Sequence, residues 1–285
     1  MKHLLFLSIA AFAFCLTCCS DESTINDDTL CWNDNLDLGI SSLDEGCLHN
    51  DICISMIDNW NICPNNSTDV INEINRLYLG VENIVKDRFS LTDEEVEEIF
   101  AQVDLDDLVS IASQDDFWKL EVERMEVSTS LKQILIGIEP ILDEIPENVP
   151  LHYTVTYVND RIMSYLHTNL PYLNTEEKVL FEMFTDVLMS SNYLWTSEEL
   201  GGLGYYSKFS SALNNNCNNL KVSSRFFGKW ILADAIGTVA GTAAALVTTG
   251  GWASLPLCGG IPCAGVAGVI RGAGSSVVAA IYEYN

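Results

Sequence analysis

The sequence predicts an all-α protein, because two kinds of helical pattern fill most of its length. From residue 69 to residue 195, apolar residues recur every three or four positions, which is the spacing of one buried helix face. From residue 230 to the end, two apolar segments rich in glycine and alanine flank a turn-rich loop. The predicted architecture is a helical ectodomain with a C-terminal glycine-rich helical hairpin, preceded by a signal peptide and a disordered acidic tether.

The N-terminal residues 1–18 have the layout of a secretory signal. A short polar start is followed by Leu4–Leu16, an apolar run that is too short to span a bilayer. The next residues, Leu16-Thr17-Cys18-Cys19, resemble the lipobox of bacterial lipoproteins. This resemblance implies cleavage before Cys19 and attachment of lipid to Cys19. An ordinary signal peptide or an N-terminal membrane anchor is the alternative.

The residues after the predicted cleavage point are polar. Ser20, Asp21 and Glu22 resemble the acidic export signal of surface lipoproteins in the Bacteroidota. This resemblance implies a lipid-anchored protein of the outer membrane, exposed at the cell surface. Residues 19–66 are rich in Asp, Asn and Ser without a sustained period. We therefore predict an acidic tether and a cysteine-rich segment there.

The cysteines suggest disulfides, because an exported protein lies in a compartment where they persist. Of the ten cysteines, seven remain after removal of the signal and lipidation of Cys19. Four of them fall within 33 residues and could form two bridges in any of three pairings. These four are Cys31, Cys47, Cys53 and Cys63. Cys258 and Cys263 could close a small loop, which leaves Cys217 unpaired.

Zinc is the competing interpretation of this segment, because Cys47 and Cys53 flank His49. Structural zinc sites usually use closely spaced ligand pairs, and the chain has no C-x-x-C pair. Disulfides are therefore favoured, and no metal site is predicted.

Residues 67–227 are predicted to form the helical domain. Thr92 with Glu95, and Asn174 with Glu177, have the spacing of capping boxes at helix starts. The β-branched run at 152–158 could form a strand or open a helix. Tyr193 and Trp195 are expected to be buried, as are the other aromatic residues of this domain.

The charge distribution divides the chain into two parts. There are 14 Lys and Arg against 40 Asp and Glu, and residues 1–200 carry a net charge of −29 while residues 201–285 carry +3. An acidic surface of this kind excludes nucleic acid as a partner, because binding it requires basic residues. The acidic runs are expected to be solvated helix faces. A divalent cation held by Asp104–Asp107 and Asp115–Asp116 is a weaker alternative.

The sequence nominates no catalytic centre. It lacks a Gly-rich phosphate loop, a G-x-S-x-G sequence and an H-E-x-x-H sequence. No nucleophile is paired with a recognisable base, and only three histidines remain after signal removal. We therefore expect a protein that is not an enzyme and needs no cofactor.

Residues 228–285 are predicted to form the hairpin. Its segments, Ile231–Thr249 and Ala264–Tyr282, would each be about 28 Å long as helices, close to the thickness of a bilayer core. Glycines four residues apart allow two helix backbones to approach closely. The predicted helix-packing residues are Gly237, Gly241, Gly268 and Gly272. Asp234 and Arg271, which interrupt the apolar runs, would lie about 10 Å out of register in a simple hairpin.

The last 110 residues or so resemble known sequences in composition. Residues 233–241, 265–268 and 275–276 resemble glycine-zipper, bacteriocin-like segments. With residues 174–178 and 190–195, they also resemble the ending of a loosely defined group of Bacteroidota surface proteins. The group implies a surface or secreted protein and transfers no activity.

Two functions follow from these patterns. The favoured hypothesis is a lipid-anchored cell-envelope protein with a non-catalytic binding role, in which the hairpin packs inside the domain and an unknown protein is the partner. The alternative is a membrane-active, bacteriocin-like or pore-forming protein whose hairpin inserts into a bilayer. The membrane is a partner in both, through the lipid alone or through lipid and hairpin.

Overall fold

The computed structural model describes residues 45–64, 66–114, 116–143, 160–161, 164–165, 168–217, 227–249, 257–258 and 261–284. Within this part of the chain the regular elements are helices, apart from the two-residue strands β1 (Leu257–Cys258) and β2 (Ile261–Pro262), which pair antiparallel. The predicted all-α class is therefore confirmed. The signal peptide, the tether as far as residue 44 and the run at 152–158 lie outside the described residues.

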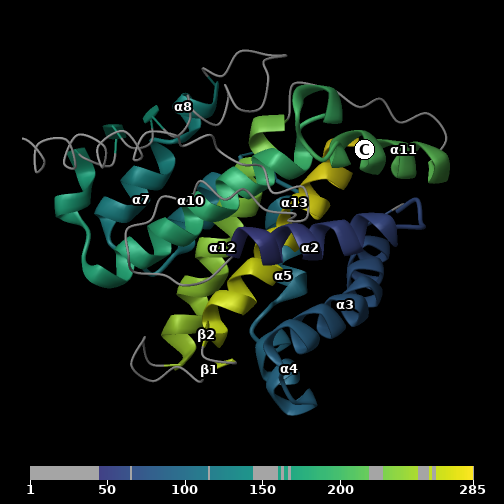
Figure 1. Cartoon of the computed structure of the whole chain (residues 1–285), viewed down its shortest axis with the longest axis horizontal. Coiled ribbons are helices and arrows are strands. Elements are labelled where there is room, and N and C mark those ends of the chain that lie inside the picture. The colour runs from purple at the N-terminus through teal and green to yellow at the C-terminus, as the bar shows by residue number, and fades with distance from the viewer. Residues whose placement is uncertain are drawn as a thin grey trace, which may run out of the picture.

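The C-terminal hairpin forms the centre of the fold (Figure 1). It consists of α12 (Phe227–Thr249) and α13 (Cys263–Tyr284), which pack against each other along their length. The predicted glycine-rich hairpin is therefore confirmed. Both helices are long and apolar enough to cross a membrane, yet the apolar stretches are 89% and 100% buried inside the protein.

The other described helices surround this hairpin. The long helix α10 (Thr175–Trp195) packs against α12, and α2 (Glu45–Asp58) packs against both α10 and α13. Further helices cover the remaining sides. They are α3 (Ser67–Phe89), α4 (Asp93–Phe100), α5 (Leu105–Ala112), α6 (Phe117–Arg124), α7 (Thr129–Ile136), α8 (Glu139–Asp143) and α11 (Tyr205–Asn216), with the 3₁₀ turns η1 (Leu170–Tyr172) and η2 (Glu198–Leu200).

The local signals in the sequence mark where several of these helices begin. Thr92 and Glu95 form the predicted capping box of α4, and Asn174 and Glu177 form that of α10. Glu177 also accepts a hydrogen bond from the Ser128 backbone amide, so the cap of α10 is tied to the start of α7. These reciprocal bonds satisfy amide groups that no helical carbonyl can reach.

The aromatic side chains at the end of α10 belong to the core, as predicted. Tyr193 and Trp195 are both buried. Trp195 lies edge-on against Trp230 of α12, with 5.2 Å between the ring centroids. This contact fixes the end of α10 against the start of the hairpin.

The segment 19–66 requires a correction. Its residues 45–58, predicted as part of a cysteine-rich segment outside the helical domain, form the helix α2, and this helix is buried between α10 and α13. Because α2 is covered on most of its circumference, its buried side chains include polar ones such as His49 and Asn50 and follow no single stripe. The predicted boundary between residues 66 and 67 therefore does not separate this helix from the core.

Candidate functional site

The two helices of the hairpin touch through their glycines. A Cβ atom built on Gly237 would lie 2.9 Å from Cα of Gly272, and one on Gly241 would lie 2.9 Å from Cα of Gly268. Gly237, the earlier glycine of the pair in α12, faces Gly272, the later of the pair in α13, and Gly241 faces Gly268, so the helices run antiparallel. All four predicted helix-packing glycines therefore lie at the contact, where any side chain would meet backbone.

Close packing brings two charged side chains of the hairpin into the interior. Asp234 of α12 is 0% exposed and Arg271 of α13 is 7% exposed. They do not pair with each other. Each is instead met by polar groups from the surrounding helices, which makes two separate buried clusters.

The first, here the Asp234 cluster, consists of His49, Cys53, Ser191, Trp195 and Asp234. The carboxylate oxygen Oδ2 accepts hydrogen bonds from the Ser191 hydroxyl and, at 2.9 Å, from the Trp195 indole nitrogen. The other oxygen, Oδ1, lies 2.8 Å from Nε2 of His49. Asp234 is thereby joined to α10 on one side and to α2 on the other.

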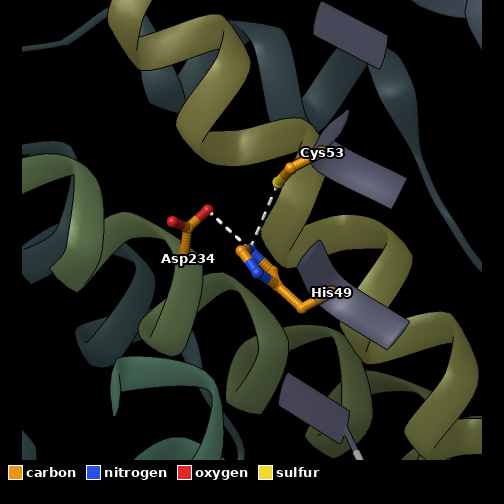
Figure 2. Close-up of side chains that lie close together, drawn as sticks. All are labelled: His49, Cys53 and Asp234. Atoms are coloured by element: carbon orange, nitrogen blue, oxygen red, sulfur yellow. Dashed lines mark hydrogen bonds and ion pairs between the residues drawn. The ribbon is translucent and has the colours of Figure 1, made fainter. Parts of the chain in front are cut away.

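The imidazole of His49 stands between two partners (Figure 2). Its Nε2 atom also lies 3.4 Å from Sγ of Cys53, one helical turn further along α2. Its Nδ1 atom lies 3.1 Å from the side-chain oxygen of Asn50. His49, Cys53 and Asp234 each offer a donor atom, and these atoms lie within 4.8 Å of one another in a fully buried place.

Burial and charge set the protonation of these groups. Burial lowers the pKa of His49, but the Asp234 carboxylate and the Cys53 sulfur raise it by more, so the pKa lies well above its usual value. Burial also raises the pKa of the Cys53 thiol, and Asp234 adds to this while His49 acts in the opposite direction. In the absence of another cation, these pKa values favour a protonated imidazole and a protonated thiol.

The second, here the Arg271 cluster, consists of Arg271, Glu121 and Asp107. The guanidinium donates to Glu121 of α6 at 2.7 Å and to Asp107 of α5 at 3.1 Å. Burial lowers the pKa of Arg271, but Glu121 and Asp107 raise it by more, so the net change is upward. The cluster is therefore a structural ion pair that ties α13 to α5 and α6.

The same contacts leave little support for the weaker cation alternative at the acidic runs. Asp104 caps α5 by accepting from the Asp107 amide, and Asp107 binds Arg124 as well as Arg271. Asp116 lies 3.8 Å from Lys119. Three described carboxylates of this region are thus engaged by a helix cap or by basic side chains, namely Asp104, Asp107 and Asp116.

The disulfides differ from the predicted grouping. Cys63 is bonded to Cys217, the cysteine expected to be unpaired, across a separation of 154 residues. Cys53 is a buried free thiol, which corrects its assignment to a disulfide. Cys47 and Cys263 are each disulfide-bonded. The Cys63–Cys217 bridge depends on the meeting of α11 with α2, which no sequence spacing reveals.

The remaining predicted site residues lie outside the described part of the chain. They are the lipidation site Cys19, the export residues Ser20, Asp21 and Glu22, and Cys31. The same holds for the side chain of Cys258. His49 and Cys53 could have been noticed together, because their spacing of four residues places them on one face of a helix. Their third partner, Asp234, is 185 positions away from His49 in the sequence, so only the fold joins them.

Comparison with known proteins adds no likeness. The chain matches no known protein family, and neither the curated proteins nor the solved structures contain a significant match. The geometry of the chain itself must therefore carry any functional proposal.

The surface of the described part has shallow, open hollows. One, of about 380 Å³, lies where the cap of α10 meets the end of α12. Its apolar lining includes Leu180 and the half-exposed Val247, and its carboxylates include Glu126 and Glu176. We call it the Val247 groove. Its combination of an apolar floor and negative charge suits a ligand that carries both apolar and basic groups.

Proposed function

We propose that this chain is a lipid-anchored cell-envelope protein with a non-catalytic binding role, and that its glycine-rich hairpin is the internal scaffold of the binding domain. The observation that carries the scaffold part is the way the hairpin is enclosed. Its apolar stretches are buried, and its buried charged side chains Asp234 and Arg271 find their partners on α2, α10, α5 and α6.

These polar contacts also bear on the membrane alternative. A charged side chain at the centre of a bilayer costs about 2.5–3.5 kcal/mol on insertion scales. Transfer of the hairpin into lipid would separate Asp234 and Arg271 from every partner that neutralises them in the fold. The small side chains of the hairpin gain little from lipid in return. The folded domain is therefore the more favourable place for it.

The lipid anchor and the surface location rest on the sequence alone. The test is intact-mass measurement of the protein extracted from membranes, in which we expect loss of residues 1–18 and addition of acyl chains to Cys19. Cys19→Ala should leave the precursor uncleaved. A protein that is cleaved elsewhere and recovered in the soluble periplasmic fraction would contradict the anchor.

The scaffold is tested by comparing stability with membrane activity in the same protein. Gly241→Leu places a branched side chain against Gly268, and overpacking of this kind costs about 1–3 kcal/mol. We expect this variant to lower the melting temperature of the whole domain, and we expect the folded wild-type protein to cause no dye leakage from liposomes. Leakage by folded wild-type protein, with a domain that melts unchanged in Gly241→Leu, would favour the membrane-active function.

The binding role is assigned to the Val247 groove. A photo-reactive residue in place of Val247 should cross-link a partner on intact cells, since this side chain is 49% exposed beside the carboxylates of the groove. The matched control replaces Leu79 of α3, which is 62% exposed and lies outside the groove. Equal labelling from both positions, or none from position 247, would contradict the assignment.

A further inference from the structure

In the Asp234 cluster, Nε2 of His49 faces Oδ1 of Asp234, and the way these two atoms interact depends on whether Nε2 carries a proton. Asn50 donates its amide nitrogen to the Ser190 carbonyl at 3.0 Å, so its side-chain oxygen faces Nδ1 of His49. Nδ1 must therefore carry the proton that is donated to Asn50. The lone pair of Nε2 is then directed toward Cys53 and Asp234.

The carboxylate across from this lone pair is also an acceptor. Oδ1 of Asp234 is fully buried, and the polar atom that faces it is Nε2 of His49 at 2.8 Å, which can donate to it only when the imidazole is protonated. Two acceptors can stay this close only with a positive charge between or upon them. That charge is either a second proton on the imidazole or a metal ion.

The outer partners of the three groups match those of a metal site. Metal-binding histidines usually donate their second ring nitrogen to a neighbouring oxygen, and metal-binding carboxylates are themselves hydrogen-bonded. Here Asn50 receives the His49 proton, Ser191 and Trp195 donate to Asp234, and Ser276 hydrogen-bonds the Cys53 sulfur. Each inner group is held in place by an outer one.

The state of Cys53 gives independent support. Among the cysteines whose side chains the structure describes, Cys47, Cys63, Cys217 and Cys263 are in disulfides, and Cys53 alone is free. It lies one turn after His49, so both side chains project from the same face of α2. A retained thiol beside an imidazole and a carboxylate is a set of metal ligands.

We propose that His49 Nε2, Cys53 Sγ and Asp234 Oδ1 bind one zinc ion. Zinc accepts nitrogen, sulfur and oxygen together, whereas calcium and magnesium require oxygen. Zinc bond lengths and tetrahedral angles place nitrogen and sulfur ligands about 3.5 Å apart. The 3.4 Å between Nε2 and Sγ agrees. The 2.8 Å between Nε2 and Oδ1 is shorter than the about 3.3 Å that tetrahedral zinc requires, so the carboxylate must move outward to admit the ion. Zinc's fourth position is left to water or to the hydroxyl of Ser276.

The site is structural in character, because all three ligands are 0% exposed and offer no approach for a substrate. Zinc would join α2 to α12 and neutralise the buried carboxylate of Asp234. It would also bind the thiolate form of Cys53, which protects that sulfur from pairing with another cysteine. The proposal is independent of the lipid anchor and of the Val247 groove.

The experiment is metal analysis of the full-length, disulfide-intact protein after refolding with excess zinc and removal of unbound metal. We expect one zinc per chain. Cys53→Ser and His49→Gln should each lower zinc affinity at least about tenfold, and Ser191→Ala, which removes an outer hydrogen bond, by about 10- to 100-fold. The matched control is Glu121→Gln, which changes a buried carboxylate of the Arg271 cluster and should keep the full zinc content.

A second measurement identifies the sulfur ligand without relying on stability. Cobalt bound in place of zinc should show a near-ultraviolet thiolate charge-transfer band that Cys53→Ser abolishes. Circular dichroism establishes that each variant is folded. Folded wild-type protein that holds no zinc, or cobalt-loaded protein without the thiolate band, would overturn the proposal and leave a protonated His49 as the counter-charge to Asp234.

Discussion

The two buried charges of the hairpin are neutralised in different ways. Arg271 meets two carboxylates, so the protein itself supplies the opposite charge. Asp234 accepts hydrogen bonds from two neutral donors, and its other oxygen lies 2.8 Å from the imidazole of His49, whose charge depends on pH. The Arg271 cluster is held by a permanently charged guanidinium, whereas the positive charge in the Asp234 cluster comes from a titratable imidazole or, as proposed, from zinc. A buried charged side chain can therefore belong either to an ion pair within the protein, as Arg271 does, or to a metal site, as we propose for Asp234.

The largest expected loss of stability concerns the Arg271 cluster. Arg271→Met would leave Glu121, which is 6% exposed, as a buried charge without its partner. Breaking a buried pair in this way costs about 3–5 kcal/mol, and urea unfolding of the zinc-loaded protein should show a loss of that size.

The double variant Arg271→Met with Glu121→Gln serves as its control. It removes both charges and should regain part of the loss, because no isolated buried carboxylate remains. A single variant within about 0.5 kcal/mol of the wild type would mean that Arg271 is solvated in solution, and the contrast with Asp234 would disappear.

A smaller loss of stability is expected at the glycine contact between α12 and α13, the helices that carry Asp234 and Arg271. In Gly268→Ala, the added methyl group would lie 2.5 Å from the Thr238 carbonyl oxygen. Overpacking against backbone costs about 1–3 kcal/mol, which urea unfolding can measure. Gly80→Ala of α3 is the control, since the nearest atom there is Oγ of Ser55 at 3.6 Å.

Gly80→Ala should be neutral or stabilising by up to about 1 kcal/mol, because alanine favours a helix over glycine. Equal effects at the two glycines would show that the backbones do not touch at Gly268. The two clusters would then not be held in register by this contact.

The smallest expected change in stability at neutral pH concerns the protonation of His49. It distinguishes the Asp234 cluster from the Arg271 cluster most clearly. In metal-free protein, the pKa of His49 is raised by Asp234 and Cys53 despite burial. A group with a raised pKa contributes stability that is fully present below about pH 6.5 and is lost as the pH rises through the raised pKa. The melting temperature of chelator-treated protein should therefore fall toward alkaline pH.

Zinc-loaded protein should show the opposite trend on the acidic side. Zinc requires a neutral imidazole and a thiolate, so protons compete with it and the stability that it adds should decline as the pH falls. His49→Gln should flatten both profiles. Identical profiles with and without zinc would show that the Asp234 cluster does not bind the ion.

The sequence predicted those parts of the fold that depend on local spacing. The repeats of three and four, the capping boxes at Thr92 and Asn174, and the hairpin follow from contacts within a turn or two of helix. The helix α2 could not be read this way, because it is buried on most sides and has no polar face to create a period.

The buried clusters depend on tertiary contacts and were not predictable. Asp234 and Arg271 were visible as interruptions of apolar runs, but their partners come from helices far away in the sequence. The Cys63–Cys217 bridge has the same origin. An isolated charged residue in an apolar helix thus predicts that a polar partner exists, but the sequence does not identify that partner.

The central position of the hairpin has a consequence for how the protein is made. α12 and α13 follow all the other described helices in the chain, so the middle of the core is synthesised after the helices that surround it. Until then, the earlier helices have apolar faces with nothing to cover them, and the chain must be kept from aggregating. A polypeptide interrupted before α12 would lack its core and be open to proteolysis. The earlier helices therefore cannot complete their core before α12 and α13 have been made.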